Sequence, residues 1–188
     1  MSAERARGDG LGEDRVTSGY VRVTQLADLF AEARGLSVRT MVIDVEPLVA
    51  PWDSGQEALD WGIACILDEV RTVPSVRAVT FSTNSDRRPS RVPACPGIQV
   101  AYLASAGKPL HTAPYRDLPR PGAVAGDQVP TDGVLAHRLG FSFLHYMPEL
   151  TGVPLGPSLM HHWGGLMRPL LFSRPVTRID AGHNGRSL

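Results

Sequence analysis

The sequence predicts an α/β protein with a three-layer, doubly wound and mainly parallel sheet of five strands. Short apolar, β-branched runs alternate along the chain with segments of helical periodicity. Several of these runs end in a polar or acidic residue, which is typical of buried parallel strands that place a site at their carboxyl ends. The 188 residues are enough for one domain with a full core.

Each expected element has its own local signal. The five expected strands are apolar runs, at residues 40–44, 76–81, 98–103, 122–125 and 141–146. Three helices are expected from amphipathic spacing, at residues 25–33, 54–71 and 131–139. Thr24 and Ser54 are the expected N-caps, and Gly35 and Gly140 the expected stops. Prolines crowd the segments between Ser82 and Ile98 and between Lys108 and Gly122, so both connections are expected to be mostly loop.

Composition limits the classes of function. The formal net charge is zero, which gives no electrostatic reason to expect nucleic acid or an anionic membrane as a partner. Two cysteines favour a reduced, cytoplasmic setting over a disulfide scaffold. No apolar run is long enough for a transmembrane segment. Residues 1–17 are expected to be a disordered tail, 18–175 the α/β domain, and 176–188 a flexible C-terminal tail.

Four polar stretches end or follow these runs, in an order that suits carboxylate-based phosphate chemistry. They contain Asp44 with Glu46, then Ser82, then Lys108, and finally Asp127 with Asp132. An aspartate can form an acyl-phosphate, and a lysine can hold it in place. Further carboxylates can bind the Mg²⁺ that neutralises phosphoryl oxygens. The stretches therefore predict one site at the carboxyl edge of the sheet.

These residues resemble a known family. The run from Ile43 to Trp52, Ser82, the Ala-Gly-Lys-Pro-Leu run around Lys108 and the Gly-Asp-Gln-x-x-Thr-Asp run from Gly126 resemble haloacid-dehalogenase-like (HAD) phosphatases. The similarity is greatest to the small, capless type that includes bacterial YqeG-like proteins and mitochondrial phosphatidylglycerophosphatase. It extends from about Val21 to Tyr146. The resemblance implies a Rossmannoid sheet in the order 5-4-1-2-3, counted over the five expected strands, without a sizeable cap domain.

The resemblance also implies a role for each site residue. Asp44 would be the nucleophile, Glu46 the acid–base, and Ser82 a ligand of the transferring phosphoryl group. Lys108 would pair with the nucleophile and the phosphate. Mg²⁺ would lie between Asp44, the backbone carbonyl of Glu46, Asp127 and Asp132. A few carboxylates with phosphate oxygens are a ligand set that Mg²⁺ accepts.

The first motif departs from the family pattern of Asp-x-Asp-x-Thr. Glu46 is one methylene longer than the usual aspartate, and Leu48 replaces a threonine hydroxyl. Pro47 removes a backbone N–H, and Thr83 stands where an asparagine is common. Three interpretations stay open: a slow or specialised phosphatase, altered chemistry, or a protein that binds a phosphorylated ligand without turnover.

The expected partner is a phosphorylated substrate. Without a cap, the site suits a large substrate or one that a partner protein presents. The apolar segment 158–172 is a candidate docking surface for that partner, and closing the domain's own core is the alternative. Adjacent His161 and His162 are expected to pack there and not to bind a metal, because neighbouring helical side chains diverge.

Overall fold

The computed structural model of this chain describes residues 19–147 and 171–172. The expected tails, 1–17 and 176–188, lie outside the described residues, as does most of segment 158–172. Within the described part no helix has the length and apolarity needed to cross a bilayer.

One parallel sheet organises the described residues, in the order β1-β6-β5-β2-β3-β4. Its strands are β1 Tyr20–Val23, β2 Thr40–Asp44, β3 Ala78–Ser82, β4 Gln99–Leu103, β5 Gly122–Gly126 and β6 Ser142–Tyr146. An α/β fold with a single parallel sheet is therefore confirmed. The expected number of strands was wrong, because Tyr20–Val23 adds a sixth strand at one edge. This strand has only four residues, so its apolar pattern is too short to be distinguished from a loop.

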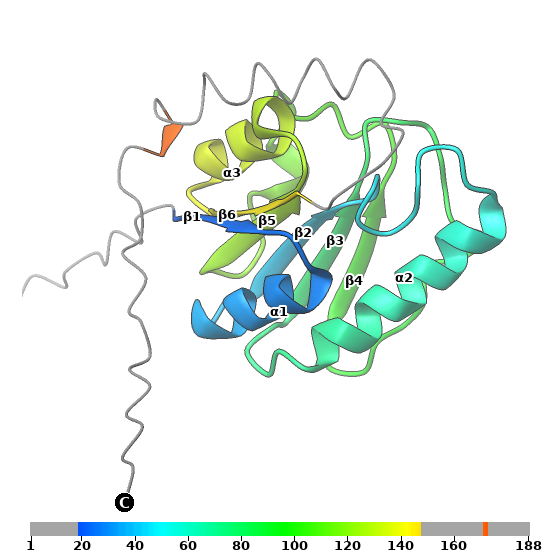
Figure 1. Ribbon diagram of the computed structural model, residues 1–188, viewed down its shortest axis with the longest axis horizontal. Coiled ribbons are helices and arrows are strands. Elements are labelled where there is room, and N and C mark those ends of the chain that lie inside the picture. The colour runs from blue at the N-terminus through cyan, green and yellow to red at the C-terminus, as the bar shows by residue number, and fades with distance from the viewer. Residues whose placement is uncertain (1–18, 148–170, 173–188) are drawn as a thin grey trace, which may run out of the picture.

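Helices cover both faces of the sheet, as Figure 1 shows. The helices α1 Leu26–Gly35 and α2 Gln56–Arg71 lie on one face, and α3 Val134–Leu139 lies on the other. Side chains of β2 alternate between the two layers: Met41 and Ile43 join the cluster under α1 and α2, whereas Val42 packs with Leu135 of α3. This two-sided burial explains the uninterrupted apolar runs of β2 and β5.

Local details differ from the sequence-based expectations in a few places. Neither Thr24 nor Ser54 caps a helix, because the N-cap positions are Gln25 and Gly55. The expected helix 131–139 is divided into a π-helical turn, Val129–Gly133, and α3. Gly140 does stop α3, with a left-handed φ of 65°. The proline-rich connections are mostly loop, with one short 3₁₀ turn at Ala113–Tyr115.

The topology brings the carboxyl ends of the central strands together. Asp44 ends β2, Ser82 ends β3 beside it in register, and Asp127 follows the last residue of β5. Because the strands are parallel, all three residues lie at one edge of the sheet. The same edge receives Lys108 from the β4–β5 connection and Asp132 from the π-helical turn.

Candidate functional site

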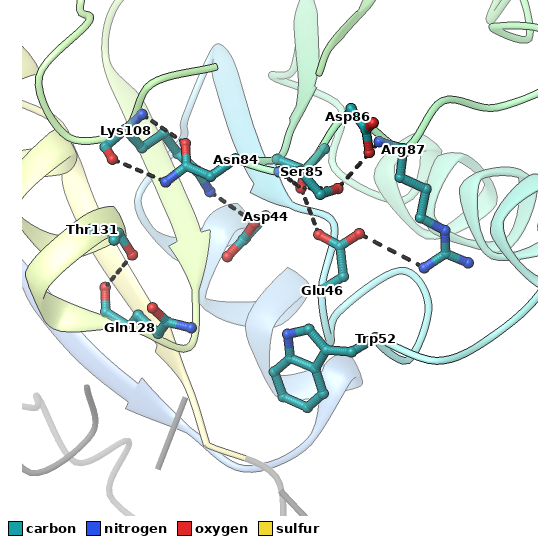
Figure 2. Close-up of a pocket in the computed structure, with 11 residues that line it drawn as sticks. Asp44, Glu46, Trp52, Asn84, Ser85, Asp86, Arg87, Lys108, Gln128 and Thr131 are labelled. Carbon is teal, nitrogen blue, oxygen red and sulfur yellow. Dashed lines mark hydrogen bonds and ion pairs between the residues drawn. The ribbon is translucent and has the colours of Figure 1, made fainter. Parts of the chain in front are cut away.

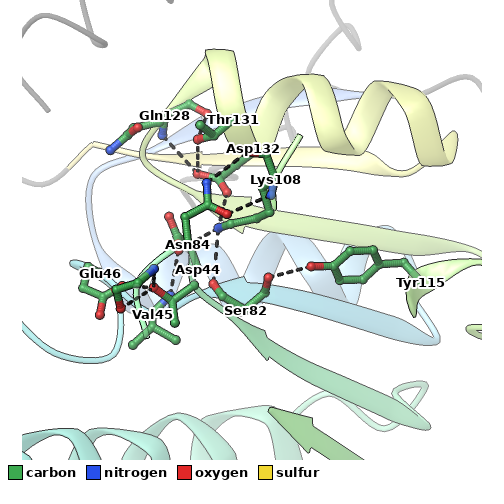
Figure 3. A network of polar contacts seen from close by, with 12 residues as sticks. Asp44, Val45, Glu46, Ser82, Asn84, Lys108, Tyr115, Gln128, Thr131 and Asp132 are labelled. Carbon is green, nitrogen blue, oxygen red and sulfur yellow. Dashed lines mark hydrogen bonds and ion pairs between the residues drawn. The ribbon is translucent and has the colours of Figure 1, made fainter. Parts of the chain in front are cut away.

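Lys108 lies at the centre of this edge and joins two of the carboxylates, as Figure 3 shows. Its Nζ donates to Asp44 Oδ1 at 2.7 Å, to Asp132 Oδ1 at 2.7 Å and to the backbone carbonyl of Ser82 at 3.2 Å. All three ammonium protons therefore have acceptors. Burial lowers the pKa of Lys108, but the charges of Asp132 and Asp44 outweigh it, so its pKa is raised and the ammonium stays charged.

The loop that carries Lys108 is fixed by the loop after β3. The side chain of Asn84 accepts from the Lys108 backbone N–H at 2.8 Å and donates to the Lys108 carbonyl at 2.9 Å. Ala106 N–H adds a bond to the carbonyl of Thr83 at 2.9 Å. Gly107 has a positive φ of 67°, which a residue with a side chain rarely adopts. Sequence reasoning missed Asn84, since an asparagine after a strand is equally good turn chemistry.

Three buried carboxylates gather beside this lysine. Asp44, Asp127 and Asp132 each bring one oxygen within 4.8 Å of the oxygens of the other two. Gly126 lets Asp132 approach, because a Cβ at position 126 would be 2.3 Å from the Asp132 Cγ. Buried oxygens at this spacing, with only one lysine to neutralise them, fit a hard divalent cation such as Mg²⁺.

The crowding of carboxylates contributes to a raised pKa of Asp44. Burial, followed by the charge of Asp132, raises the pKa of Asp44 well above its usual 3.8, although Lys108 acts in the opposite direction. One oxygen, Oδ1, is held by Lys108 and by the backbone N–H of Val45 at 2.9 Å. These two donors fix the orientation of the carboxylate at the end of β2.

Glu46 lines a cleft at this edge of the sheet, together with Asp44 and Lys108 (Figure 2). Thr83 Oγ1 donates to Glu46 Oε2 at 2.7 Å, and Arg87 Nη1 is 3.7 Å from Glu46 Oε1. The guanidinium of Arg87 also donates to four oxygens of the loop 51–55, so Arg87 is bound within the protein itself.

Ser82, which was expected to bind the phosphoryl group, is turned away from the cleft, and Leu48 is apolar. The Ser82 hydroxyl is buried and lies 2.6 Å from the hydroxyl of Tyr115, and Ser82 does not line the cleft. Burial raises the pKa of Tyr115, so its phenol stays protonated. Leu48 packs in the core under α2. The sequence had no signal for Tyr115, which reaches Ser82 from the β4–β5 connection.

These residues surround an open cleft of about 380 Å³. Its lining residues are Asp44, Glu46, Trp52, Thr83, Asn84, Ser85, Asp86, Arg87, Lys108, Gln128 and Thr131. Trp52 forms one wall, as Figure 2 shows, and Asp44 and Lys108 lie deeper. A cleft of this size suits a small molecule or the phosphorylated end of a larger one.

Only the end of the candidate docking surface 158–172 lies among the described residues. Phe172 is buried, with its ring 5.5 Å from that of Tyr20 and 5.9 Å from that of Phe143. This one residue belongs to the core on the α3 side of the sheet. The adjacent histidines, His161 and His162, lie outside the described residues.

Comparison with protein-family models, with curated proteins and with solved structures finds no match to this chain. The geometry of the site therefore carries the functional argument.

Proposed function

We propose that the protein is a Mg²⁺-dependent phosphate-monoester hydrolase of the HAD-like, capless type, acting through an aspartyl-phosphate on Asp44. One observation carries the proposal: a single buried lysine bridges Asp44 and Asp132, and an oxygen of Asp127 lies within 4.8 Å of an oxygen of each. A buried group of carboxylates is costly for a fold, and a bound cation removes that cost.

In this proposal Asp44 attacks phosphorus, and the bond from phosphorus to the leaving oxygen breaks. Glu46 gives a proton to that oxygen and later takes one from the water that hydrolyses the aspartyl-phosphate. Lys108 orients Asp44 and balances charge on the phosphoryl oxygens. Mg²⁺, held by Asp44, Asp127, Asp132 and the backbone carbonyl of Glu46, would neutralise the same oxygens when bound.

Trapping the phosphoenzyme tests the proposal. Wild-type protein with Mg²⁺ and an aryl phosphate should give a covalent phosphate on Asp44, identified by mass spectrometry of peptides. Asp44→Asn should abolish both the adduct and the release of phosphate. An Asp44→Asn variant that hydrolyses the ester as fast as wild type would refute the aspartyl-phosphate.

The lack of free hydroxyl groups for the phosphoryl group favours a second function. Ser82 is engaged by Tyr115, and Leu48 offers no hydroxyl, so the phosphoryl group loses two of its expected ligands. The alternative is a catalytically impaired relative that binds a phosphorylated ligand or partner protein. It predicts no hydrolysis by wild type above the Asp44→Asn control, together with Mg²⁺-dependent binding of beryllium fluoride, a phosphoryl mimic.

The substrate class follows from the openness of the cleft. Between the strands of the described part, the connections are loops and single helices, and none encloses the cleft. We propose a phosphomonoester whose leaving group extends out of the cleft, either because it is large or because a partner protein presents it.

A further inference from the structure

We infer that Thr83 and Arg87 are positioning residues that hold the Glu46 carboxylate at the cleft to serve the leaving group. This inference rests on the proposed function. It concerns residues that neither bind the phosphoryl group nor belong to the carboxylate cluster.

The hydroxyl of Thr83 contacts both Glu46 and Ser85. Its oxygen accepts from the backbone N–H of Ser85 at 3.0 Å and lies 3.0 Å from the Ser85 hydroxyl. With the Thr83 proton donated to Glu46 Oε2 at 2.7 Å, the Ser85 hydroxyl has to donate to Thr83. The three residues form a directed chain of hydrogen bonds that ends on Oε2 of Glu46.

Arg87 fixes the same carboxylate from the other side. Its guanidinium donates to the carbonyls of Pro51 at 3.0 Å, Ser54 at 2.8 Å and Gly55 at 3.1 Å, and to the Ser54 hydroxyl at 2.8 Å. These acceptors set the plane of the fork. At 3.7 Å from Oε1, Arg87 attracts the carboxylate without forming a hydrogen bond. Oε2 of Glu46 therefore accepts a hydrogen bond from Thr83, whereas Oε1 has no hydrogen bond within the described residues.

This geometry assigns Oε1 to proton transfer. In the first step the proton leaves Oε1 for the leaving oxygen as the phosphorus–oxygen bond breaks, giving an alcohol, the aspartyl-phosphate and an ionised Glu46. In the second step water attacks phosphorus, its proton returns to Oε1, and Asp44 is released. A leaving group that is stable as an anion has little need of the first proton transfer.

Leaving-group dependence therefore tests the inference. We choose Thr83→Val, which keeps the shape of the side chain and removes the donor, and measure phosphoenzyme formation in a single turnover with excess enzyme. With phenyl phosphate, a misplaced Glu46 should slow this step by about 10- to 100-fold. With 2,4-dinitrophenyl phosphate the change should stay within about threefold, because that group leaves unprotonated.

Controls separate positioning from folding. Thr83→Ser retains the hydroxyl and should restore the rate with phenyl phosphate. Thr80→Val makes the same change at a buried threonine of β3, three residues before Thr83 and outside the cleft, and should leave both rates unchanged. If Thr83→Val does not fold, Arg87→Gln provides the same comparison and should show the same selective loss.

Two results would overturn the inference: equal slowing of both esters, which indicates a structural role, or no slowing of either. If wild type forms no phosphoenzyme with either ester, the proposed function fails, and this inference with it. A wild type that forms the adduct, with variants that lack leaving-group selectivity, refutes the positioning role alone.

Discussion

At the scale of single residues, a methyl group added at position 126 is expected to reach the carboxylate of Asp132. The new Cβ would be 2.3 Å from Asp132 Oδ2 and 2.6 Å from its Cβ. Gly126→Ala should lower the free energy of unfolding by about 1–3 kcal/mol, as overpacking usually does. It should also weaken Mg²⁺ binding, because Asp132 has to move. Chemical denaturation and calorimetry measure the two effects.

Gly35 offers a matched control for that substitution. A Cβ added there meets no atom within 4 Å, and the residue ends α1 with no positive φ. Gly35→Ala should raise the free energy of unfolding by up to about 1 kcal/mol and leave Mg²⁺ binding unchanged. Equal losses in both variants would mean that contact with Asp132 is not the cause.

The sequence predicts individual site residues unevenly. The position of Asp44 follows from the sequence because an acidic residue at the end of an apolar run is placed by the sheet itself. Thr83 and Asn84 reach their partners through the conformation of the loop after β3. Arg87 depends on four oxygens of a distant loop. Such contacts become visible only when two loops are placed side by side.

At the scale of elements, the edge strand β1 is connected to the site. The Tyr20 hydroxyl lies 2.7 Å from His145 Nδ1, and His145 Nε2 lies 2.9 Å from the backbone carbonyl of Asp127. Since a carbonyl only accepts, Nε2 donates to it, and Nδ1 shares the second hydrogen bond with the Tyr20 hydroxyl. The strand that sequence analysis missed thus orients a residue that supports the backbone of Asp127.

Tyr20→Phe tests this connection. The variant keeps the ring packing and removes one hydrogen bond, so it should lower the free energy of unfolding by about 1 kcal/mol. Because the histidine is then less well oriented, Mg²⁺ affinity should also fall. An unchanged Mg²⁺ affinity in calorimetry would show that β1 contributes to stability alone.

The loop between β2 and α2 is a second element with a specific expectation. Arg87 fastens residues 51–55, and Trp52 on this loop forms a wall of the cleft. A substrate ring packed on the indole should lose that contact in Trp52→Ala. We expect KM for an aryl phosphate to rise about 2- to 10-fold, with a smaller change for an alkyl phosphate. Equal changes for both esters would argue against a contact with the ring.

At the scale of the whole molecule, the raised pKa of Asp44 makes stability depend on pH and on metal. The folded protein binds this proton more tightly than the unfolded chain does. The stabilisation is therefore complete below the usual pKa of 3.8 and is lost as pH rises through the raised value. In the proposed site Mg²⁺ would bind the ionised form of Asp44, so it should raise the melting temperature more at pH 8 than at pH 5.

Asp44→Asn supplies the control, since it has no proton to lose at this position. Its melting temperature should respond less to pH than that of wild type, and Mg²⁺ should have little effect on it. A Mg²⁺ response that is equal at both pH values in wild type would contradict the coupling between ionisation of Asp44 and metal binding.

The general architecture follows from periodicity, because β2, β3 and β5 are buried on both faces and need continuous apolar runs. The additional strand β1 cannot be predicted in this way, because its four residues become a strand only through pairing with β6. Likewise, the cluster of carboxylates is implied by parallel strands that end at one edge. Its distances depend on the turn at Val129–Gly133, which the sequence presented as an ordinary helix start.

Lys108 is the only lysine in the sequence. The protein therefore has one side-chain amine, and that amine is buried between two carboxylates. Acylating reagents that attack free amines should spare it in the folded protein and modify it after unfolding. A single chemical mark, read on one peptide, thus reports whether the site is assembled in a given sample, without any substrate.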